Sequence, residues 1–528
     1  MNKKHAFVIS ALLIQFNVAF SQKKAPENWF NLDPKTDKVY GVSTNRAYNE
    51  LLKDKKSKPV IVAVIDGGTE VAHEDLKNVI WVNGNEILGN GIDDDKNGYI
   101  DDVNGWSFIG GKDSDVVEDN LELTRVYRMY KNKYDLVDAT TLQSDNERDE
   151  LSKYLKAKKA YLGKKENEQR IYDFINELHE SVLKIVKSTG KENPNLAEIK
   201  IYTATNKFET MAIATLSNTL SKGGSVQNLI AEIKGGLEHY DKSLNYQLNP
   251  DFDPRSRVGD NYNDLTEKYY GNTHVSGPKG DHGTHVAGII AASRNNDLGI
   301  NGVADNVKIM VLRVVPDGDE RDKDIANSIR YAVDNGAKII NMSFGKDFSP
   351  FKSTVDDAVK YAVSKDVLLI HAAGNDAKDL DKEENFPNDR YLNSTELNSS
   401  WIEVGASSWQ KKKATTAVFS NYGKINVDVF APGVDIYSCI PENKYASFNG
   451  TSMAAPVTAG VAAVLRSYFP ELTAQQTKEI ILESAIRYKK KVYKPGSDKK
   501  KEKVLLSDLC VSGGIVNVYE AVKLAMKK

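Results

Sequence analysis

The chain has 528 residues, of which 40% are hydrophobic and 27% charged, and its formal net charge is −2. This composition is that of a globular protein, and the near-balanced charge excludes a global field for nucleic acid or an anionic membrane. The length suits several average domains, or one large domain that carries an insertion.

Residues 1–21 read as a secretory signal peptide. Lys3 and Lys4 give a basic start, residues 6–13 an apolar core, and residues 19–21 a small-x-small cleavage site. The alternative is a buried N-terminal strand or helix. No later stretch approaches the ~20 apolar residues of a membrane span. We therefore expect an exported protein, periplasmic or extracellular, without membrane contact after signal cleavage.

A short N-terminal arm, residues 22–58, precedes the first clear strand. That strand, residues 60–65, is a continuous and mostly β-branched apolar run, which is typical of a parallel sheet covered on both faces. Asp66 follows it directly and is therefore expected at the carboxyl end of the strand, where such sheets form their sites. Taken alone, Asp66 is equally well a turn residue.

An acidic loop follows at residues 93–102. Its oxygen-bearing side chains alternate as in the first half of an EF-hand calcium loop, although flanking helices are not evident. The alternative is a solvated acidic turn, but closely packed carboxylates repel one another without a cation. We predict structural calcium here, with the ligands Asp93, Asp95, Asn97, the Tyr99 carbonyl, Asp101 and Asp102.

Residues 112–258 differ in composition from the rest of the chain. They are rich in Lys, Glu, Asn, Tyr and Leu, and their apolar residues recur at helical spacing. We predict an inserted α-helical subdomain of three to five helices, as a packed bundle or an extended hairpin. The remaining domain is then discontinuous and comprises residues 59–111 and 259–528.

A second motif, residues 280–288, opens a helix with His282 at its start and His285 one turn later. A zinc-binding pair is the alternative interpretation. It fits poorly, because the histidines are three apart with no glutamate between them, unlike the metalloprotease pattern.

Strand and helix patterns alternate beyond residue 302. Their lengths predict an α/β fold with a doubly wound, mostly parallel sheet and helices on both faces. Thr473 and Gln476 form a predicted capping box at the start of the last long helix. The predicted strands cover residues 307–315, 337–342, 367–373, 401–406 and 428–431, and the predicted helices cover residues 325–335, 355–364 and 474–485.

Ser452 lies in a small-residue turn, residues 448–456, that runs into an apolar helical pattern. At a helix N-terminus the unpaired backbone N–H groups and the helix dipole favour a developing negative charge. Alone, such a serine is usually an N-cap. Together with a histidine base and a carboxylate it can become a nucleophile, and the order Asp66, His282, Ser452 is that of subtilisin.

The motifs that carry these residues, 64–68, 282–288 and 450–456, resemble the three signatures of the subtilisin-like serine proteases, or subtilases. Residues 372–376 resemble the oxyanion segment of that family, and residues 341–345 resemble its substrate-binding strand.

The resemblance implies an exported serine endopeptidase that acts on proteins or peptides. Ser452 would form the acyl-enzyme, His282 would be general base and then acid, and Asp66 would orient His282. Asn375 would donate to the oxyanion, and His285 would be packed rather than catalytic. The implied substrate-binding residues are Ser343, Phe344, Gly345, Ala372, Ala373 and Gly374, and a second calcium site is implied at Asp75 and Asn296.

Some positions depart from the family pattern. Gly67 replaces a usual Ser or Thr, so one supporting hydroxyl is missing, and His371 replaces a small residue. Lys346 is expected to bias the cleft toward acidic side chains. No segment long enough for the usual inhibitory prodomain precedes Asp66.

Other interpretations stay open at this point. The chain could be a catalytically silent binding or scaffold protein that works through the insertion, or a peptide ligase that uses the same site. Cys439 and Cys510 could form a disulfide or remain as buried thiols.

Overall fold

The computed structural model describes residues 25–138, 140, 142–410, 415–497 and 502–528. These residues form two compact units, Lys158–Asn249 and Pro26–Ala157 with Pro250–Lys528. The signal peptide predicted at residues 1–21 lies outside the described residues. Within the described ranges, no helix has both the length and the apolar character needed to span a bilayer.

The larger unit is built on a sheet that, within the described chain, has nine strands in the order β10-β13-β7-β6-β5-β4-β1-β3-β2. Neighbouring strands are parallel except for β10, which is antiparallel to β13. The strands are β1 (Val60–Asp66), β2 (Gly105–Ser107), β3 (Val307–Arg313), β4 (Ile339–Met342), β5 (Leu368–Ala372), β6 (Trp401–Ser407), β7 (Val429–Pro432), β10 (Ile486–Arg487) and β13 (Gly514–Ile515).

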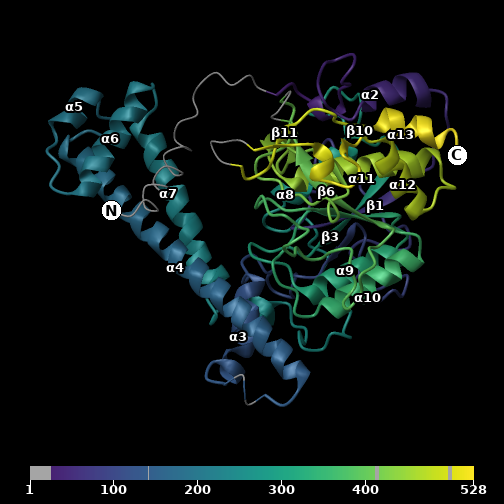
Figure 1. Ribbon diagram of the computed structural model, residues 1–528, viewed down its shortest axis with the longest axis horizontal. Coiled ribbons are helices and arrows are strands. Elements are labelled where there is room, and N and C mark those ends of the chain that lie inside the picture. Colours follow the sequence, from purple (N-terminus) through teal and green to yellow (C-terminus); the bar gives the residue numbers. More distant parts are fainter. Residues whose placement is uncertain (1–24, 139, 141, 411–414, 498–501) are drawn as a thin grey trace. The chain divides into compact units, whose positions relative to one another are not determined.

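Helices cover both faces of this sheet, which confirms the doubly wound prediction (Figure 1). On one face, α9 (Asp322–Asp334) and α10 (Lys352–Ser364) pack against alternate apolar residues of the central strands, including Ala63, Ile65, Met310 and Leu312. The opposite face is covered by α8 (Asp281–Ala291) and α11 (Thr451–Tyr468). The predicted capping box is present at α12 (Ala474–Ser484), where Thr473 and Gln476 bond reciprocally.

The strand order reverses its direction of growth at β1. This strand lies between β3 and β4, with β3 and the edge strand β2 on one side and β4 to β7 following outward in chain order on the other. Ligands of open α/β sheets bind outside the carboxyl ends of the strands at such a switch point. Asp66 is the last residue of β1, and Ser343 directly follows β4.

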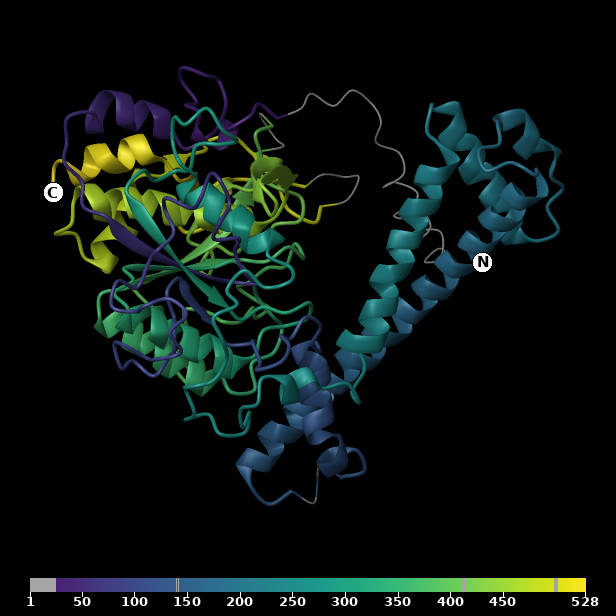
Figure 2. The same cartoon turned by 180° about the vertical axis from the view of Figure 1, so that it is seen from behind.

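The N-terminal arm is an integral part of the larger unit. It contains η1 (Trp29–Asn31), α2 (Thr44–Ala47) and η2 (Tyr48–Leu52). Trp29 is fully buried, and its indole N–H donates to the Val434 carbonyl at 3.1 Å. The arm lies beside the C-terminal helix α13 (Val518–Ala525), where the Val518 N–H donates to the Val42 carbonyl at 2.7 Å (Figure 2).

Several short elements were not predicted because they lack a long apolar run. They are β2 and the antiparallel pairs β8 (Ile436–Ile440) with β9 (Lys444–Phe448) and β11 (Val492–Tyr493) with β12 (Lys503–Val504). The remaining short helices are η4 (Ser243–Gln247), η5 (Pro254–Arg257) and η7 (Leu506–Asp508).

The smaller unit is helical. It contains α5 (Leu196–Ile201), α6 (Lys207–Ser221), α7 (Val226–Lys242) and most of α4 (Asp145–Ser188). Its own apolar core gathers residues of all four helices, among them Val182, Ile199, Leu216 and Leu229. The first helix of the predicted insertion, α3 (Glu122–Tyr134), belongs to the larger unit instead. The compact helical unit is therefore shorter than the predicted range 112–258.

Candidate active site

Asp66 and His282 form a hydrogen-bonded pair at the switch point. His282 Nδ1 lies 2.8 Å and 3.0 Å from the two carboxylate oxygens of Asp66. The helix that carries His282 packs tightly here, because a Cβ on Gly283 would lie 2.2 Å from the Gly68 carbonyl oxygen. The Asp66 side chain is 4% exposed and that of His282 is 41% exposed. Since a carboxylate accepts the Nδ1 proton, Nε2 keeps its lone pair and can act as a base.

The same contact sets the protonation of His282. Burial favours the neutral imidazole, but the charge of Asp66 and the hydrogen bond to it outweigh burial and raise the pKa of His282 above its ordinary value of 6.5. An imidazole with a pKa near neutrality is suited to general acid and base catalysis.

Ser452 lies in the first turn of α11. Its hydroxyl donates to the Ser343 carbonyl oxygen at 3.0 Å. In the described part of the chain no hydrogen bond joins the Ser452 hydroxyl to His282. Catalytic hydrogen bonds are often long or misaligned in ligand-free proteins and tighten when substrate binds.

Two hydrogen-bond donors converge in front of Gly450. Thr451 holds the Asn375 side chain by its oxygen, because the Thr451 N–H and Oγ1 donate to Asn375 Oδ1 at 2.9 Å and 3.1 Å. The amide Nδ2 of Asn375 is thereby turned the other way. A Cβ on Gly450 would lie 3.7 Å from this Nδ2 and 3.5 Å from the Ser452 backbone nitrogen. The two nitrogens thus border one small space, as an oxyanion site requires.

The two predicted substrate strands lie side by side, and Asn385 joins them. A Cβ on Gly345 would lie 2.7 Å from Asn385 Oδ1, and one on Gly374 would lie 3.7 Å from Asn385 Nδ2. Asn385 also donates to the Ala373 carbonyl at 3.2 Å. Asn385 and Thr451 were not predicted as functional residues, because neither side chain has a local signal that reveals these long-range contacts.

A cavity of about 370 Å³ opens beside the Asp66 and His282 pair. Its wall includes Ser343 and Phe344 from the predicted substrate strand and Val117 from the start of the predicted insertion. The other lining residues are Gly67, Pro278, Lys279, Asp281, Arg313, Val315, Pro316 and Asp317.

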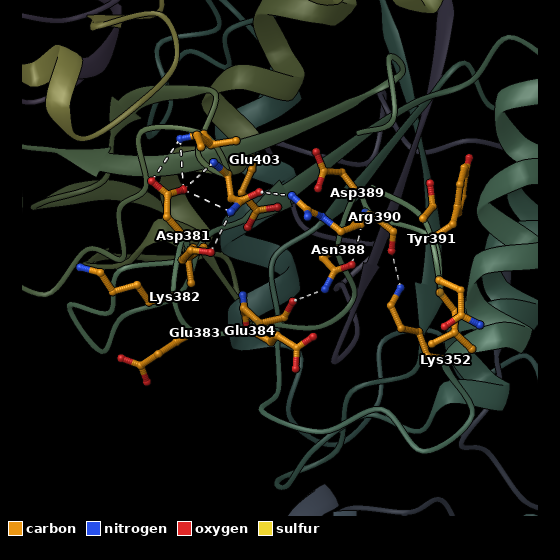
Figure 3. Close-up of a pocket in the computed structure, with 17 residues that line it drawn as sticks. Lys352, Asp381, Lys382, Glu383, Glu384, Asn388, Asp389, Arg390, Tyr391 and Glu403 are labelled. Atoms are coloured by element: carbon orange, nitrogen blue, oxygen red, sulfur yellow. Dashed lines mark hydrogen bonds between the residues drawn. The ribbon is translucent and has the colours of Figure 1, made fainter. Parts of the chain in front are cut away.

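A larger cavity, of about 480 Å³, lies elsewhere and contains none of the four predicted catalytic residues (Figure 3). Its wall is rich in charged side chains, among them Asp389, Glu403 and Lys352. Burial, together with the carboxylates of Asp428 and Glu403, raises the pKa of Asp389 to about 7. Of the four predicted catalytic residues, the smaller cavity has Asp66 and His282 in its wall, whereas Ser452 and Asn375 are not among its lining residues.

Comparison with known proteins decides the family. The model of the subtilase family matches residues 57–508. The chain belongs to the subtilase family.

Individual relatives match only part of this subtilase. The thermophilic serine proteinase of Bacillus sp. (strain AK1) is 44% identical over 188 residues, which cover 35% of this chain and 43% of the relative. Thermitase of Thermoactinomyces vulgaris is 41% identical over 187 residues, 35% of this chain and 61% of the relative. Subtilisin DY of Bacillus licheniformis is 37% identical over 206 residues, 39% of this chain and 70% of the relative. The chain thus spans less than two thirds of the length of the first two.

The expectation that Lys346 faces the cleft is wrong. Its side chain is fully buried, and its ammonium group lies 2.8 Å from a Glu122 oxygen and 2.7 Å from an Asp322 oxygen. It also donates to the Glu320 carbonyl at 2.7 Å. Burial disfavours the Glu122 carboxylate, but Arg125 and Lys346 lower its pKa to about 2. The charge of Lys346 is therefore balanced by carboxylates inside the protein, and Lys346 cannot attract acidic side chains of a substrate.

His371, which departs from the family pattern, and His285, which is expected to be packed, are both buried. His371 lies opposite Glu403 in the register of β5 and β6, and its Nδ1 is 2.9 Å from a Glu403 oxygen. His285 bonds to the carbonyls of Ile436 and Ala446 at 3.0 Å and 3.1 Å. Burial lowers the pKa of His285 to about 3. Both histidines therefore make their contacts inside the protein, and neither lines a described cavity.

The acidic loop brings together carboxylates that could hold a cation. Glu86, Asp95 and Asp102 each offer an oxygen, and these oxygens lie within 4.8 Å of one another. Asn97 Nδ2 donates to Asp95 and to Asp102, at 3.2 Å and 3.0 Å. Burial raises the pKa of Asp102, although hydrogen bonds from Tyr331, Asn97 and Asn83 oppose the shift. Glu86 was missed because it precedes the loop motif in a polar stretch.

Other predicted ligands of this loop make different contacts. Asp101 accepts backbone N–H bonds from Gly89, Asn90 and Gly91 at 2.7–3.2 Å. Asp93 accepts those of Asn97 and Gly98 at 3.0 Å and 2.8 Å. The Tyr99 side chain is buried, and its hydroxyl donates to the Lys268 carbonyl at 3.3 Å.

The second predicted calcium site also brings its residues together. Asp75 is fully buried, and its carboxylate lies 2.7 Å from Asn296 Nδ2. Burial raises the pKa of Asp75. The Cys439 thiol contacts the same carboxylate at 3.9 Å. Cys439 and Cys510 are free and buried, which answers the open question of a disulfide between them.

Proposed function

We propose that this subtilase is a serine endopeptidase. The observation that carries the proposal is the Asp66–His282 hydrogen bond at 2.8 Å, beside a cavity whose wall also contains Ser343. The hydroxyls of Ser343 and Ser452 each donate a hydrogen bond to the carbonyl of the other residue. Ser452 is thereby held next to this cavity wall, which supports it as the nucleophile. Membership of the subtilase family supports the same assignment.

The proposed reaction proceeds through an acyl-enzyme. Ser452 Oγ attacks the scissile carbonyl carbon while His282 Nε2 takes the hydroxyl proton, and Asp66 stabilises the imidazolium that forms. The negative charge passes to the carbonyl oxygen, which receives hydrogen bonds from Asn375 Nδ2 and the Ser452 N–H. His282 then gives its proton to the leaving amine, and water releases the acid product by the reverse sequence.

The substrate backbone would pair with residues 343–345 as an added β-strand. Residues 372–374 would line the opposite wall of the pocket for the side chain before the scissile bond. Asn385 contacts both segments, which supports a polar end to this pocket. Val117 contributes to the cavity wall, which supports the proposal that the start of the insertion limits access by large folded substrates.

We propose two structural calcium sites. Glu86, Asp95 and Asp102 would form the core of the first, because the oxygens of the buried Glu86 and Asp102 and of the half-buried Asp95 converge, and calcium prefers such hard ligands. Asp75 and Asn296 would contribute to the second, after a half-turn of the Asn296 amide that presents its oxygen. The ion would neutralise carboxylates whose pKa burial raises, and would thereby stabilise the fold.

The enzyme is proposed to be exported from the cytoplasm. The basic and apolar pattern of residues 1–21 supports a cleaved signal peptide and a periplasmic or extracellular protease. Protein or peptide substrates are the proposed partners.

Hydrolysis assays test the proposed activity. Wild type, Ser452→Ala and the exposed control Ser447→Ala are compared on casein and on a quenched fluorescent peptide, with cleavage sites found by mass spectrometry. Wild type and Ser447→Ala should cleave internal peptide bonds, and Ser452→Ala should not. A wild type that binds peptides without cleaving them would favour the silent binding protein instead.

A further inference from the structure

The backbone beside Asp66 has little intrinsic stiffness. Asp66 is followed by two glycines, and Gly68 adopts a φ of +127°. The Gly67 N–H donates to Asp66 Oδ1 at 2.7 Å, the same oxygen that is 2.8 Å from His282 Nδ1. Because glycine is conformationally permissive, the two peptide groups that meet at Gly67 are fixed by their hydrogen bonds, and the Asp66 carbonyl of the first accepts from the Val314 and Val315 N–H groups at 2.9 Å and 3.2 Å.

Arg313 fixes the second of these peptide groups, Gly67–Gly68. It is the register neighbour of Asp66 on the adjacent strand β3, and its Nε donates to the Gly67 carbonyl at 3.1 Å. The arginine is only 2% exposed. Gly277 makes room for it, because a Cβ at this position would lie 2.3 Å from Arg313 Nε.

The other nitrogens of the guanidinium point to the start of the insertion. Nη2 donates to the Val116 carbonyl at 2.6 Å, and Nη1 donates to Ser107 Oγ at 3.2 Å. Asp115, whose oxygen is 3.6 Å from Nη1, supplies the opposite charge. A planar guanidinium can satisfy these three directions at once, which a lysine ammonium on a flexible stem cannot.

We propose that Arg313 is a positioning residue for the catalytic pair: it holds the Gly67–Gly68 peptide group, and through Gly67 the Asp66 carboxylate, against His282, and it links this peptide group to Asp115 and Val116. This inference rests on the proposed function, in which Asp66 orients His282. Arg313 lines the cavity beside the pair, but its described hydrogen bonds go to Gly67, Ser107 and Val116 and to none of the triad side chains, so its effect passes through Gly67.

Three variants test the proposal. Arg313→Met removes the charge and the donors but keeps much of the volume, and Arg313→Lys keeps the charge but loses the planar fork. Arg330→Met is the control, since it removes a partly buried arginine whose Nη2 donates to the Thr354 carbonyl at 3.5 Å. For each, kcat per titrated active site, KM and the pH profile of kcat/KM are measured on a peptide substrate.

Arg313→Met should lower kcat by about 10- to 100-fold with KM within about twofold, because small misplacements of catalytic groups cost rates of this order. The kcat of Arg313→Lys should lie between those of Arg313→Met and wild type, and the kcat of Arg330→Met should equal that of wild type. The acid limb of kcat/KM should move to lower pH in Arg313→Met, since a loosened Asp66 raises the pKa of His282 less. An unchanged kcat per titrated site and an unchanged acid limb would overturn the proposal.

A second readout does not depend on catalysis. The pKa of His282 is measured by NMR titration of protein labelled with nitrogen-15 in histidine, with the signal assigned by His282→Ala. A lower pKa in Arg313→Met supports the positioning role even if wild type cleaves no peptide, in which case the proposed function alone fails. An unchanged pKa would overturn the positioning role even in an active protease.

Discussion

Ser452 and Ser343 exchange hydrogen bonds. Ser452 Oγ donates to the Ser343 carbonyl at 3.0 Å, and Ser343 Oγ donates to the Ser452 carbonyl at 2.9 Å. Asn341 supports the pair by donating to Ser343 Oγ at 2.9 Å. The first turn of α11 and the end of β4 are therefore fixed to one another. The proposed nucleophile thus keeps its place relative to the strand that would hold the substrate.

Replacing Asp66 by asparagine should change both rate and pH dependence. Without the carboxylate, kcat should fall by about 10⁴-fold, as for other triads that lose this group. Burial lowers the pKa of His282 and Asp66 raises it, so removal of the charge should bring this pKa below its ordinary value of 6.5.

Because the base must be neutral, kcat/KM rises with pH through the pKa of His282. The acid limb should therefore shift to lower pH in Asp66→Asn. A pH-rate profile on a peptide substrate checks this expectation. An acid limb that stays in place or moves to higher pH would contradict the role of Asp66.

Asn375 should act on the rate of the chemical step. Asn375→Ala removes one donor to the oxyanion and should lower kcat by about 10²- to 10³-fold with little change in KM. Thr451→Val removes the hydroxyl that donates to Asn375 Oδ1 and accepts from the Gly374 N–H. It should lower kcat by less, because the Thr451 backbone N–H still holds the amide. Steady-state kinetics that show a rise in KM alone would place Asn375 in binding.

The three residues proposed as the triad could be singled out because each lies beside a short local signal. Asp66 ends a continuous apolar strand, and His282 and Ser452 open helices with small residues. The doubly wound sheet followed from the same alternation of strands and helices. These elements form from contiguous residues, so their patterns are visible in the chain itself.

Residues whose roles depend on distant partners were missed or misread. Lys346 looked like a cleft cation because Glu122, which neutralises it, lies 224 positions away. Arg313 ends an apolar strand, where arginine is usually a solvated residue. Glu86 joins Asp95 only when the acidic loop closes on it. In each case a non-local contact sets the charge environment, and no local pattern encodes it.

Lys346 should contribute to stability and not to selectivity. Lys346→Met leaves Glu122 and Asp322 with a buried partner missing, and should lower the free energy of unfolding by about 3–5 kcal/mol. Lys360→Met, which removes an exposed pair with Asp357, should change it little. Urea unfolding and cleavage of a peptide library check the two claims. A lost preference for acidic residues with unchanged stability would contradict them.

Calcium should stabilise the folded chain. Addition of a chelator should lower the melting temperature of wild type, because an ion that binds only the folded state stabilises it by mass action. Asp102→Asn with Glu86→Gln should melt lower than wild type and respond less to added calcium. Differential scanning calorimetry with and without calcium measures both effects. Equal melting curves for wild type in calcium and in chelator would contradict the proposed sites.

The most direct test of the account is covalent labelling of the full-length protein with a fluorophosphonate, which reacts with activated serines. Mass spectrometry of the labelled peptides should find one modified residue, Ser452, in wild type and in the control Ser447→Ala. The labelling rate should rise with pH as His282 loses its proton. Wild type that stays unlabelled, or Ser452→Ala that labels equally well, would contradict the assignment of Ser452 as the nucleophile.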